Sequence, residues 1–328
     1  MTAYAQWLRY CRLVVAVDGR NEEALDLSAF RVKFHIGQAS VGKPCTAEIT
    51  VYNVAESTVK RIATPTNQVV SGRRPHVILE AGYEGSHSVI FEGDLYWKST
   101  GRENGTDTFM RLIAGTGDRA HRYAVVNASI PRGATQEEVF SIVAQSMASE
   151  GVQVANKPRL MATQLPRGKV LYQMSSDAMQ HLADTNEFEW GYTSSGLVAI
   201  RKDRSYDPNE AVIVLNAKTG LIERPMLTVD GVSAKCLLQP RIDIGTLVRI
   251  DNASIQRDSY DTSYKADVQK NEATTDSMTS ADGLYRVISR EHVGDTRGND
   301  WYTTIICEGV NAAVSPMTPT VMTNMPNF

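Results

Sequence analysis

Apolar and polar residues alternate along the first third of the chain, a pattern typical of strands that bury one face. The run Ala47-Glu48-Ile49-Thr50-Val51 is an example, and Asp18-Gly19 and Asn104-Gly105 are turn pairs between such runs. The runs rich in β-branched and aromatic residues cover 12–17, 30–36, 45–54, 75–83, 88–99 and 107–115. Residues 1–117 are therefore predicted to form a small β-barrel or sandwich, interrupted by one helical turn at 56–63.

The pattern changes to a helical period in residues 118–208. Thr135 followed by Glu138 is a capping box that opens a helix to about Glu150. Its inward stripe consists of Val139, Ile142, Val143 and Met147. A second helix is predicted at 175–185, capped by Ser175 or Ser176, and a hairpin of 187–192 and 196–201 follows it. This block is interpreted as an α+β insert.

Strand patterns return in residues 209–312. They cover 211–217, 227–240, 246–252, 284–295 and 300–310. A long polar loop at 253–283 interrupts them, and residues 313–328 form an extended tail. The predicted fold is mainly β with an α+β insert, divided into domains at 1–117, 118–208 and 209–312.

Composition is ordinary, and it narrows the function classes only slightly. The 328 residues are 42% hydrophobic and 22% charged, with a net charge of −3. There is no overall basic field to draw the chain onto nucleic acid, no run of membrane-spanning length and no signal-peptide pattern. The four cysteines, Cys11, Cys45, Cys236 and Cys307, are far apart, so buried free thiols are favoured over two disulfides.

Candidate chemistry is sparse. The six histidines lack metal-ligand spacing, and neither a nucleophile elbow nor a complete phosphate-binding glycine motif occurs. Asp184, Glu187 and Glu189 precede Trp190, and Glu187 and Glu189 are expected on one face of a strand. Glycoside hydrolysis uses such a pair of carboxylates. A solvated hairpin face is favoured. No catalytic residue, cofactor or metal is predicted, with a cell-wall hydrolase or glycan-binding module using the 184–190 hairpin kept as the alternative.

Two stretches resemble a known family. They are GLIERPMLTVDGVSAKCLLQPRIDIGTLVRI (220–250) and GLYRVISREHVGDTRGNDWYT (283–303), and they look like the second barrel of baseplate hub proteins of contractile-tailed phages. Residues 30–36 and 47–54 look like the first barrel, and the hub part of type VI secretion spike proteins is also similar. The motif residues are Pro240, Gly245, His292, Gly294, Asp295 and Trp301.

Each motif residue has a structural interpretation. Pro240 marks a strand end and Gly245 permits a close approach. His292 is expected to begin a loop that hydrogen-bonds itself through Asp295, and Trp301 is expected to return as a core anchor. The loop itself is either a contact surface or, more favoured, a plain turn.

The resemblance implies a homotrimer in which each chain contributes two barrels to a pseudo-sixfold ring. Such a ring adapts a hexameric tail tube to a trimeric central spike, contacts baseplate wedge proteins and lets DNA pass without binding it specifically. It implies a structural protein of the virion tail baseplate, made in the host cytoplasm, with no membrane partner. By the same analogy, the loop at 253–283 reaches a tube or wedge neighbour. The tail residues expected to contact the spike are Ser315, Pro316, Pro319, Pro326 and Phe328.

Overall fold

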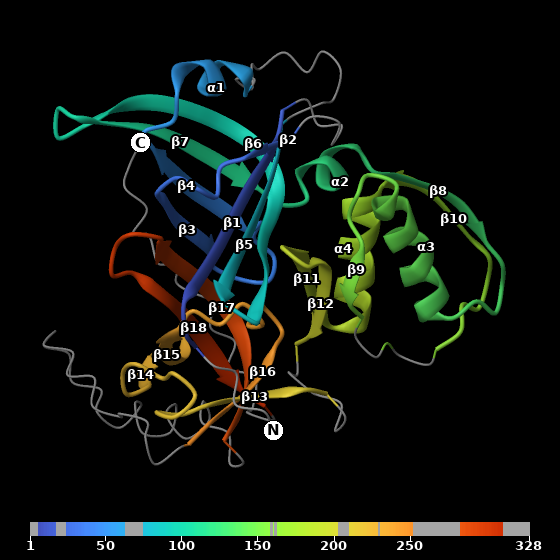
Figure 1. Cartoon of the computed structure of the whole chain (residues 1–328). Helices are drawn as coiled ribbons and strands as arrows, with labels where there is room; N and C mark the ends of the chain where they lie inside the picture. Colours follow the sequence, from blue (N-terminus) through green and yellow to red (C-terminus); the bar gives the residue numbers. More distant parts are fainter. Residues whose placement is uncertain are drawn as a thin grey trace, which may run out of the picture.

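In the computed structural model, strands make up just over half of the described residues, so the mainly β fold predicted from the sequence is confirmed (Figure 1). The structure describes residues 6–17, 24–62, 75–157, 160, 163–202, 210–228, 230–251 and 283–310. Thirteen strands from the two ends of the chain belong to one sheet, and the intervening insert adds a two-stranded and a three-stranded sheet.

The first block is an antiparallel, strongly curled sheet with the strand order β3-β4-β7-β6-β5-β1-β2. Its elements are β1 (Arg9–Ala16), β2 (Ala24–Asp26), β3 (Val32–Gln38), β4 (Thr46–Tyr52), α1 (Glu56–Arg61), β5 (His76–Tyr83), β6 (Ser86–Glu103) and β7 (Asp107–Gly115). Alternation directs every second side chain inward, as Val32, Phe34 and Ile36 of β3 show, each at most 1% exposed. The expected helical turn is α1.

The described residues of the insert form three helices and five strands. They are α2 (Asp118–Tyr123), β8 (Val125–Ile130), α3 (Gln136–Ala148), β9 (Val154–Asn156), β10 (Lys169–Met174), α4 (Ser175–Asn186), β11 (Phe188–Thr193) and β12 (Gly196–Arg201). The capping box is confirmed, because Thr135 and Glu138 exchange side-chain-to-backbone hydrogen bonds at 3.2 and 2.9 Å. The expected serine cap of α4 is wrong: its N-cap is Met174, which makes no side-chain cap bond.

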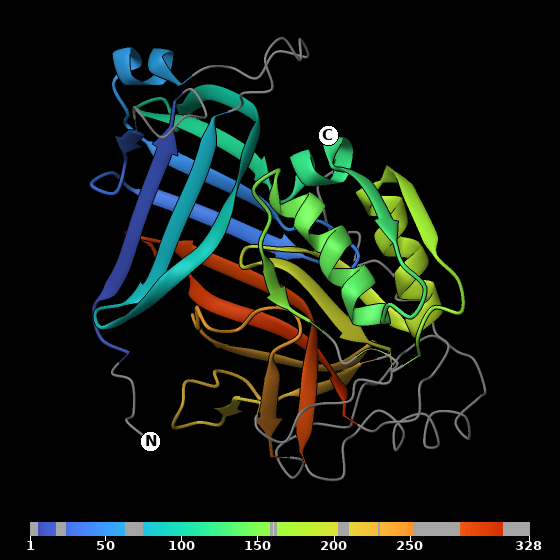
Figure 2. The same cartoon turned by 90° about the vertical axis from the view of Figure 1, so that its right-hand side faces the viewer.

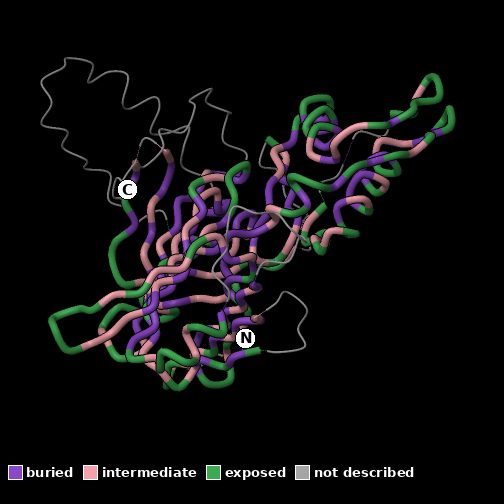
Figure 3. Tube along the Cα trace, turned by 90° about the horizontal axis from the view of Figure 1, so that it is seen from above, coloured by how far each residue is buried: buried purple, intermediate pink, exposed green. Residues whose placement is uncertain are grey.

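The insert has its own core, which involves neither β block. The stripe predicted for α3 is buried at Val139, Val143 and Met147, together with Phe140 of the same helix, while Ile142 is half-buried. Seen from above, the insert extends away from the β body as a lobe with a buried interior (Figure 3).

The described part of the last block, residues 210–228, 230–251 and 283–310, contains six strands. They are β13 (Val212–Leu215), β14 (Met226–Thr228), β15 (Gly231–Leu237), β16 (Leu247–Ile250), β17 (Leu284–Asp295) and β18 (Trp301–Gly309). β13 and β16 pair in parallel, and the remaining pairs of this block are antiparallel.

β17 joins the last block to the first. It pairs antiparallel with β3 from Arg290 opposite Gln38 to Asp295 opposite Lys33. Figure 2 shows the result, with the strands of the two blocks crossing the body as one continuous surface and the insert packed at its side. Trp301 and Leu238 of the last block are part of the first block's core.

Two further expectations concern the whole chain. All four cysteines are free thiols, as predicted, and Cys45, Cys236 and Cys307 are buried while Cys11 is half-buried. No helix among the described residues is long and apolar enough to cross a membrane.

Candidate functional site

The end of β11 brings the insert against the first β block. The backbone carbonyl of Tyr192 accepts hydrogen bonds from Gln38 Nε2 at 3.2 Å and from Thr116 Oγ1 at 3.3 Å. Both donor residues are buried. Gly191 is obligatory here, because a Cβ at this position would lie 1.6 Å from the carbonyl oxygen of Val41. Buried polar groups need partners, so these contacts fix where the insert sits.

Arg290 of β17 is the centre of this junction. Its side chain is 1% exposed and pairs with Asp243 at 2.9 Å. It also contacts Cys45 Sγ at 3.3 Å and Ser194 Oγ at 3.4 Å. Ser195 Oγ donates to Asp243 at 2.6 Å, which closes the network. Arg290 therefore connects the first block, the insert and the last block through one side chain; we name these five residues the arginine junction.

Arg290 keeps its positive charge although its side chain is buried. Burial, the largest single influence, acts against the charge of Arg290, but the Asp243 carboxylate and the Cys45 sulfur together outweigh it, so the pKa of the guanidinium is raised. For Cys45, burial dominates and raises the pKa of the thiol, with Arg290 opposing it. Cys45 is thus held as a neutral thiol, which is not the reactive form.

Asp295 organises the loop between β17 and β18. Its Oδ1 accepts from the backbone N–H groups of Arg297 and Gly298 at 2.9 Å, the self-bonding expected from the sequence. Arg31 adds a two-pronged pair at 3.1 and 2.6 Å and is the main reason why the pKa of Asp295 is lowered. Arg9 donates to the loop carbonyls of Asp295 and Asn299, both at 3.0 Å. The loop is therefore tied to the first block, while Arg297, Asn299 and Asp300 are exposed.

The expectation that His292 begins this loop is wrong. His292 lies inside β17 and is fully buried, with Nδ1 2.8 Å from Thr303 Oγ1. Burial, with Arg290 nearby, lowers the pKa of His292 well below its ordinary value, so the ring is neutral. Gly294 also belongs to β17, and a Cβ there would lie 2.3 Å from the ring of Phe34 and 2.9 Å from that of Trp301.

The other motif residues are spread over the last block. Trp301 begins β18, is 3% exposed and donates from Nε1 to the carbonyl of Gly82 at 3.3 Å. Pro240 lies in the turn after β15, and Gly245 takes a positive φ of 87°. The structure thus brings Gly294, Asp295 and Trp301 together, and leaves Pro240 and Gly245 at separate turns.

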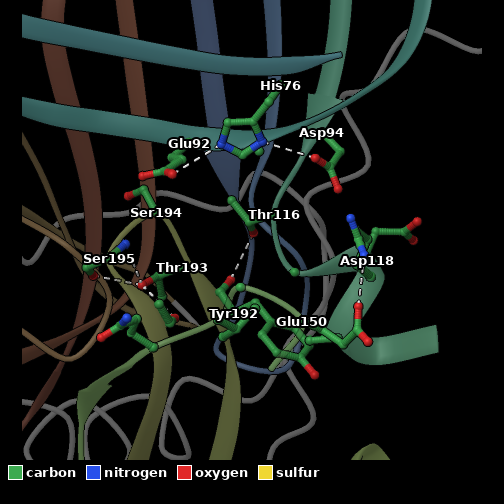
Figure 4. A pocket seen from close by; sticks show the side chains of 18 residues that line it. His76, Glu92, Asp94, Thr116, Asp118, Glu150, Tyr192, Thr193, Ser194 and Ser195 are labelled. Carbon is green, nitrogen blue, oxygen red and sulfur yellow. Dashed lines mark hydrogen bonds and ion pairs between the residues drawn. The ribbon is translucent and has the colours of Figure 1, made fainter. Parts of the chain in front are cut away.

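A cavity of about 470 Å³ lies beside the junction, between the first block and the insert (Figure 4). His76 points between Asp94, at 3.0 Å, and Glu92, at 3.1 Å. These two carboxylates raise the pKa of His76 to about 9, Asp94 contributing most. The lining residues are His76, Glu92–Asp94, Thr116–Ala120, Glu150–Gln153 and Tyr192–Gly196.

Each charged side chain that lines this cavity has an ion-pair partner. Arg119 pairs with Glu150 at 3.1 Å, and Asp118 pairs with Arg122 at 2.8 Å. Ser194 accepts a hydrogen bond from Arg290, and Ser195 donates one to Asp243. Among the described residues, neither is hydrogen-bonded to a histidine that could activate it as a nucleophile. No group of three or more potential metal ligands occurs among the described residues.

The carboxylates before Trp190 do not form the pair that the hydrolase alternative requires. Glu187 is the left-handed C-cap of α4, at φ 55°, while Glu189 lies within β11. Trp190 Nε1 donates to Gln180 at 3.0 Å, and Gln180 donates to Asp184 at 3.0 Å. The expectation that Glu187 and Glu189 share a strand face is therefore wrong. The N–H group of the Trp190 ring is already hydrogen-bonded to Gln180 of α4.

Sequence reasoning missed the members of the arginine junction. The local sequence gives one weak signal, a charged residue at position 290 in an otherwise strand-like run. Its partners lie 245, 96 and 47 positions away, at Cys45, Ser194 and Asp243. No spacing rule connects residues so distant.

Comparisons with known proteins agree on one class. A family model described as Baseplate hub gp41 matches residues 11–263. The 43 kDa tail protein of prophage MuSo2 from Shewanella oneidensis has a similar structure, with a TM-score of 0.53 at 8% identity over 92% of this chain and 98% of that one. A tail protein from Neisseria meningitidis MC58 gives a TM-score of 0.50 at 9% identity over 93% and 98%. No curated protein sequence matches.

Proposed function

Because the chain belongs to the Baseplate hub gp41 family, and is thus a phage tail baseplate component, we propose that it forms the ring at the centre of a contractile tail. Three copies, each with two β-barrel blocks, form a pseudo-sixfold ring. The ring adapts a hexameric tail tube to a trimeric central spike and contacts the wedge proteins of the baseplate. Its role is structural.

The observation that carries this proposal is the fusion of the two β blocks. β17 and β3 are hydrogen-bonded along six residue pairs, from Arg290–Gln38 to Asp295–Lys33. Two blocks held in one sheet keep a fixed angle, which a ring segment requires. Three chains with two blocks each present six β units to a sixfold neighbour while keeping threefold symmetry for a trimeric one.

The cavity and the arginine junction support a structural role over an enzymatic one. The charged side chains that line the cavity are paired with one another or with a neighbour, and the thiol of Cys45 is neutral and buried. A mildly acidic chain with a net charge of −3 also suits a passage that must not retain DNA.

The two segments expected to reach partners lie outside the described residues. They are the loop at 253–283, of which only Gly283 is described, and the tail residues from Ser315 to Phe328. Their contacts with tube, wedges and spike, like the domain boundaries after 117, 208 and 312, remain predictions.

The deciding experiment is the mass of the purified chain by light scattering, alone and with its candidate spike. We expect a trimer, or a monomer that becomes a three-to-three complex when the spike is added. An unrelated trimeric protein is the control and should leave the mass unchanged. A monomer that ignores the spike would overturn the proposal.

A further inference from the structure

The two-stranded sheet of the insert presents an uncharged face to solvent. β8 and β10 pair so that Val126, Ile130 and Leu171 face the helices and are buried. The alternate residues point outward as the pairs Ser129–Val170, Asn127–Tyr172 and Val125–Met174. Val170 and Tyr172 are 72% and 78% exposed. Such an apolar surface, which we name the outer face of β8–β10, is typical of a contact site.

The edges of this sheet are also open to pairing. Among the described residues it contains only β8 and β10, so each strand has one edge without a neighbouring strand. Proteins commonly protect such edges with charged residues or proline. β8 contains neither, and β10 has only Lys169, at its first position. The sheet can therefore accept a third strand.

The chain contains a segment whose chemistry matches this surface. Residues 311–328 include no Asp, Glu, Lys, Arg or His. At the chain's average of 22% charged residues, a segment of eighteen would carry about four. They include three of the eleven methionines, whose flexible side chains adapt to apolar surfaces. Between Pro319 and Pro326 lies the proline-free run Thr320–Met325. Its six residues equal the length of β8 and of β10.

We propose that Thr320–Met325 docks on β10 of its own chain as a third strand and covers Val170 and Tyr172. Every residue of this run has a backbone N–H to donate, which proline lacks. Its alternate side chains include Val321 and Met325 on one face, where they can flank the exposed pair on β10. The ten residues that follow Val310, ending at Thr320, reach about 35 Å when extended. Docking therefore requires Val310 to lie within this distance of the edge of β10.

This docking concerns the chain before assembly and goes beyond the ring proposed above. A spike that binds the same tail would have to displace it from β10. The docking does not depend on the oligomeric state, so its test is separate from the mass measurement.

The test compares amide hydrogen exchange across residues 169–174 in the full chain and in a chain that ends at Val310. We expect exchange at least tenfold faster in the shortened chain, with no change across β12 as the internal control. A synthetic peptide of residues 311–328, added to the shortened chain, should restore slow exchange. It should fail when Val170 and Tyr172 are both replaced by Ser. Val154→Ser, at a 43% exposed valine of the insert's other sheet, is the matched control and should respond to the peptide like its parent.

Three results would overturn the proposal. The first is equal exchange across β10 in the full and shortened chains. The second is restoration by the peptide regardless of Val170 and Tyr172. The third is loss of protection in the full chain on tenfold dilution, because the face would then bind the tail of a second copy and not that of the same chain.

Discussion

Replacing Arg290 with Met tests whether the arginine junction holds the three segments together. Met keeps much of the side-chain length but removes the charge that pairs with Asp243 at 2.9 Å and contacts Cys45 at 3.3 Å. Removing one partner of a buried pair costs about 3–5 kcal/mol, because the other charge stays behind unpaired. Asp243 is 19% exposed and keeps its bonds from Ser195 Oγ and the N–H of Ile244. We therefore expect Arg290→Met to lower the free energy of unfolding by about 3 kcal/mol, the lower end of that range.

Urea unfolding, followed by intrinsic fluorescence, measures this loss. For a urea dependence of about 3 kcal/mol per molar, the midpoint should fall by about 1 M. Lys60→Met is the matched control, since Lys60 pairs with Glu56 on the surface of α1, where the side chains are 72% and 81% exposed. Its loss should stay below about 0.5 kcal/mol.

A double-mutant cycle with Asp243→Asn separates the ion pair from the packing of the arginine stem. We expect the double variant to be more stable than the sum of the single losses predicts, by at least about 1 kcal/mol. Additive losses, or a loss at Arg290 no larger than that of the Lys60 control, would refute the view that this ion pair holds the junction.

Two shorter predictions concern the histidine that lines the cavity and the close approach of the insert to the first block. The pKa of His76 is raised to about 9 by Asp94 and Glu92, above the ordinary value of about 6.5. The stabilisation from its charged form is thus complete below about pH 6.5 and is lost as the pH rises through about 9. His76→Gln should flatten the pH dependence of the unfolding midpoint over that range, and an unchanged slope would contradict the assignment. Gly191→Ala would place a Cβ 1.6 Å from the Val41 carbonyl and should cost at least about 3 kcal/mol by thermal unfolding. Gly37→Ala, where the added Cβ meets nothing within 4 Å, is its control, and equal losses in the two variants would show that the close approach is unimportant.

Local patterns predicted most of the elements. Strand alternation and the Thr135–Glu138 capping box depend on residues a few positions apart, and the structure has strands and a helix where they were expected. Resemblance to hub proteins indicated the right family because the motifs at 220–250 and 283–303 are also local. Pairing partners were not predictable, since β17 and β3 lie more than 240 positions apart and any compatible edge could have accepted β17.

The error at His292 has a physical cause. The sequence from Gly294 to Asp300 contains turn-forming residues, so a turn was expected to begin near His292. In the structure, β3 and β18 flank β17 as far as Gly294, and β3 alone continues to Asp295. A backbone with partners on both sides stays extended, whatever its local turn preference. Because β3 comes from the other end of the chain, the local sequence around His292 gave no sign of this pairing.

The same long-range pairing explains why the buried polar groups at the junction are tolerated. A charged or amide group inside a protein is costly unless its partners are in place. Here Gln38, Arg290 and Asp243 each have at least one hydrogen-bond partner in another segment of the chain. Apolar contacts alone would allow several nearby arrangements of the three segments, because apolar packing is not directional. The polar contacts are directional, and they leave incorrect arrangements with unpaired groups. The ring subunit proposed above, which presents two β blocks at a constant angle, would benefit from that selectivity more than from extra stability. On this view, variants of the junction should broaden the range of block orientations before they unfold the chain.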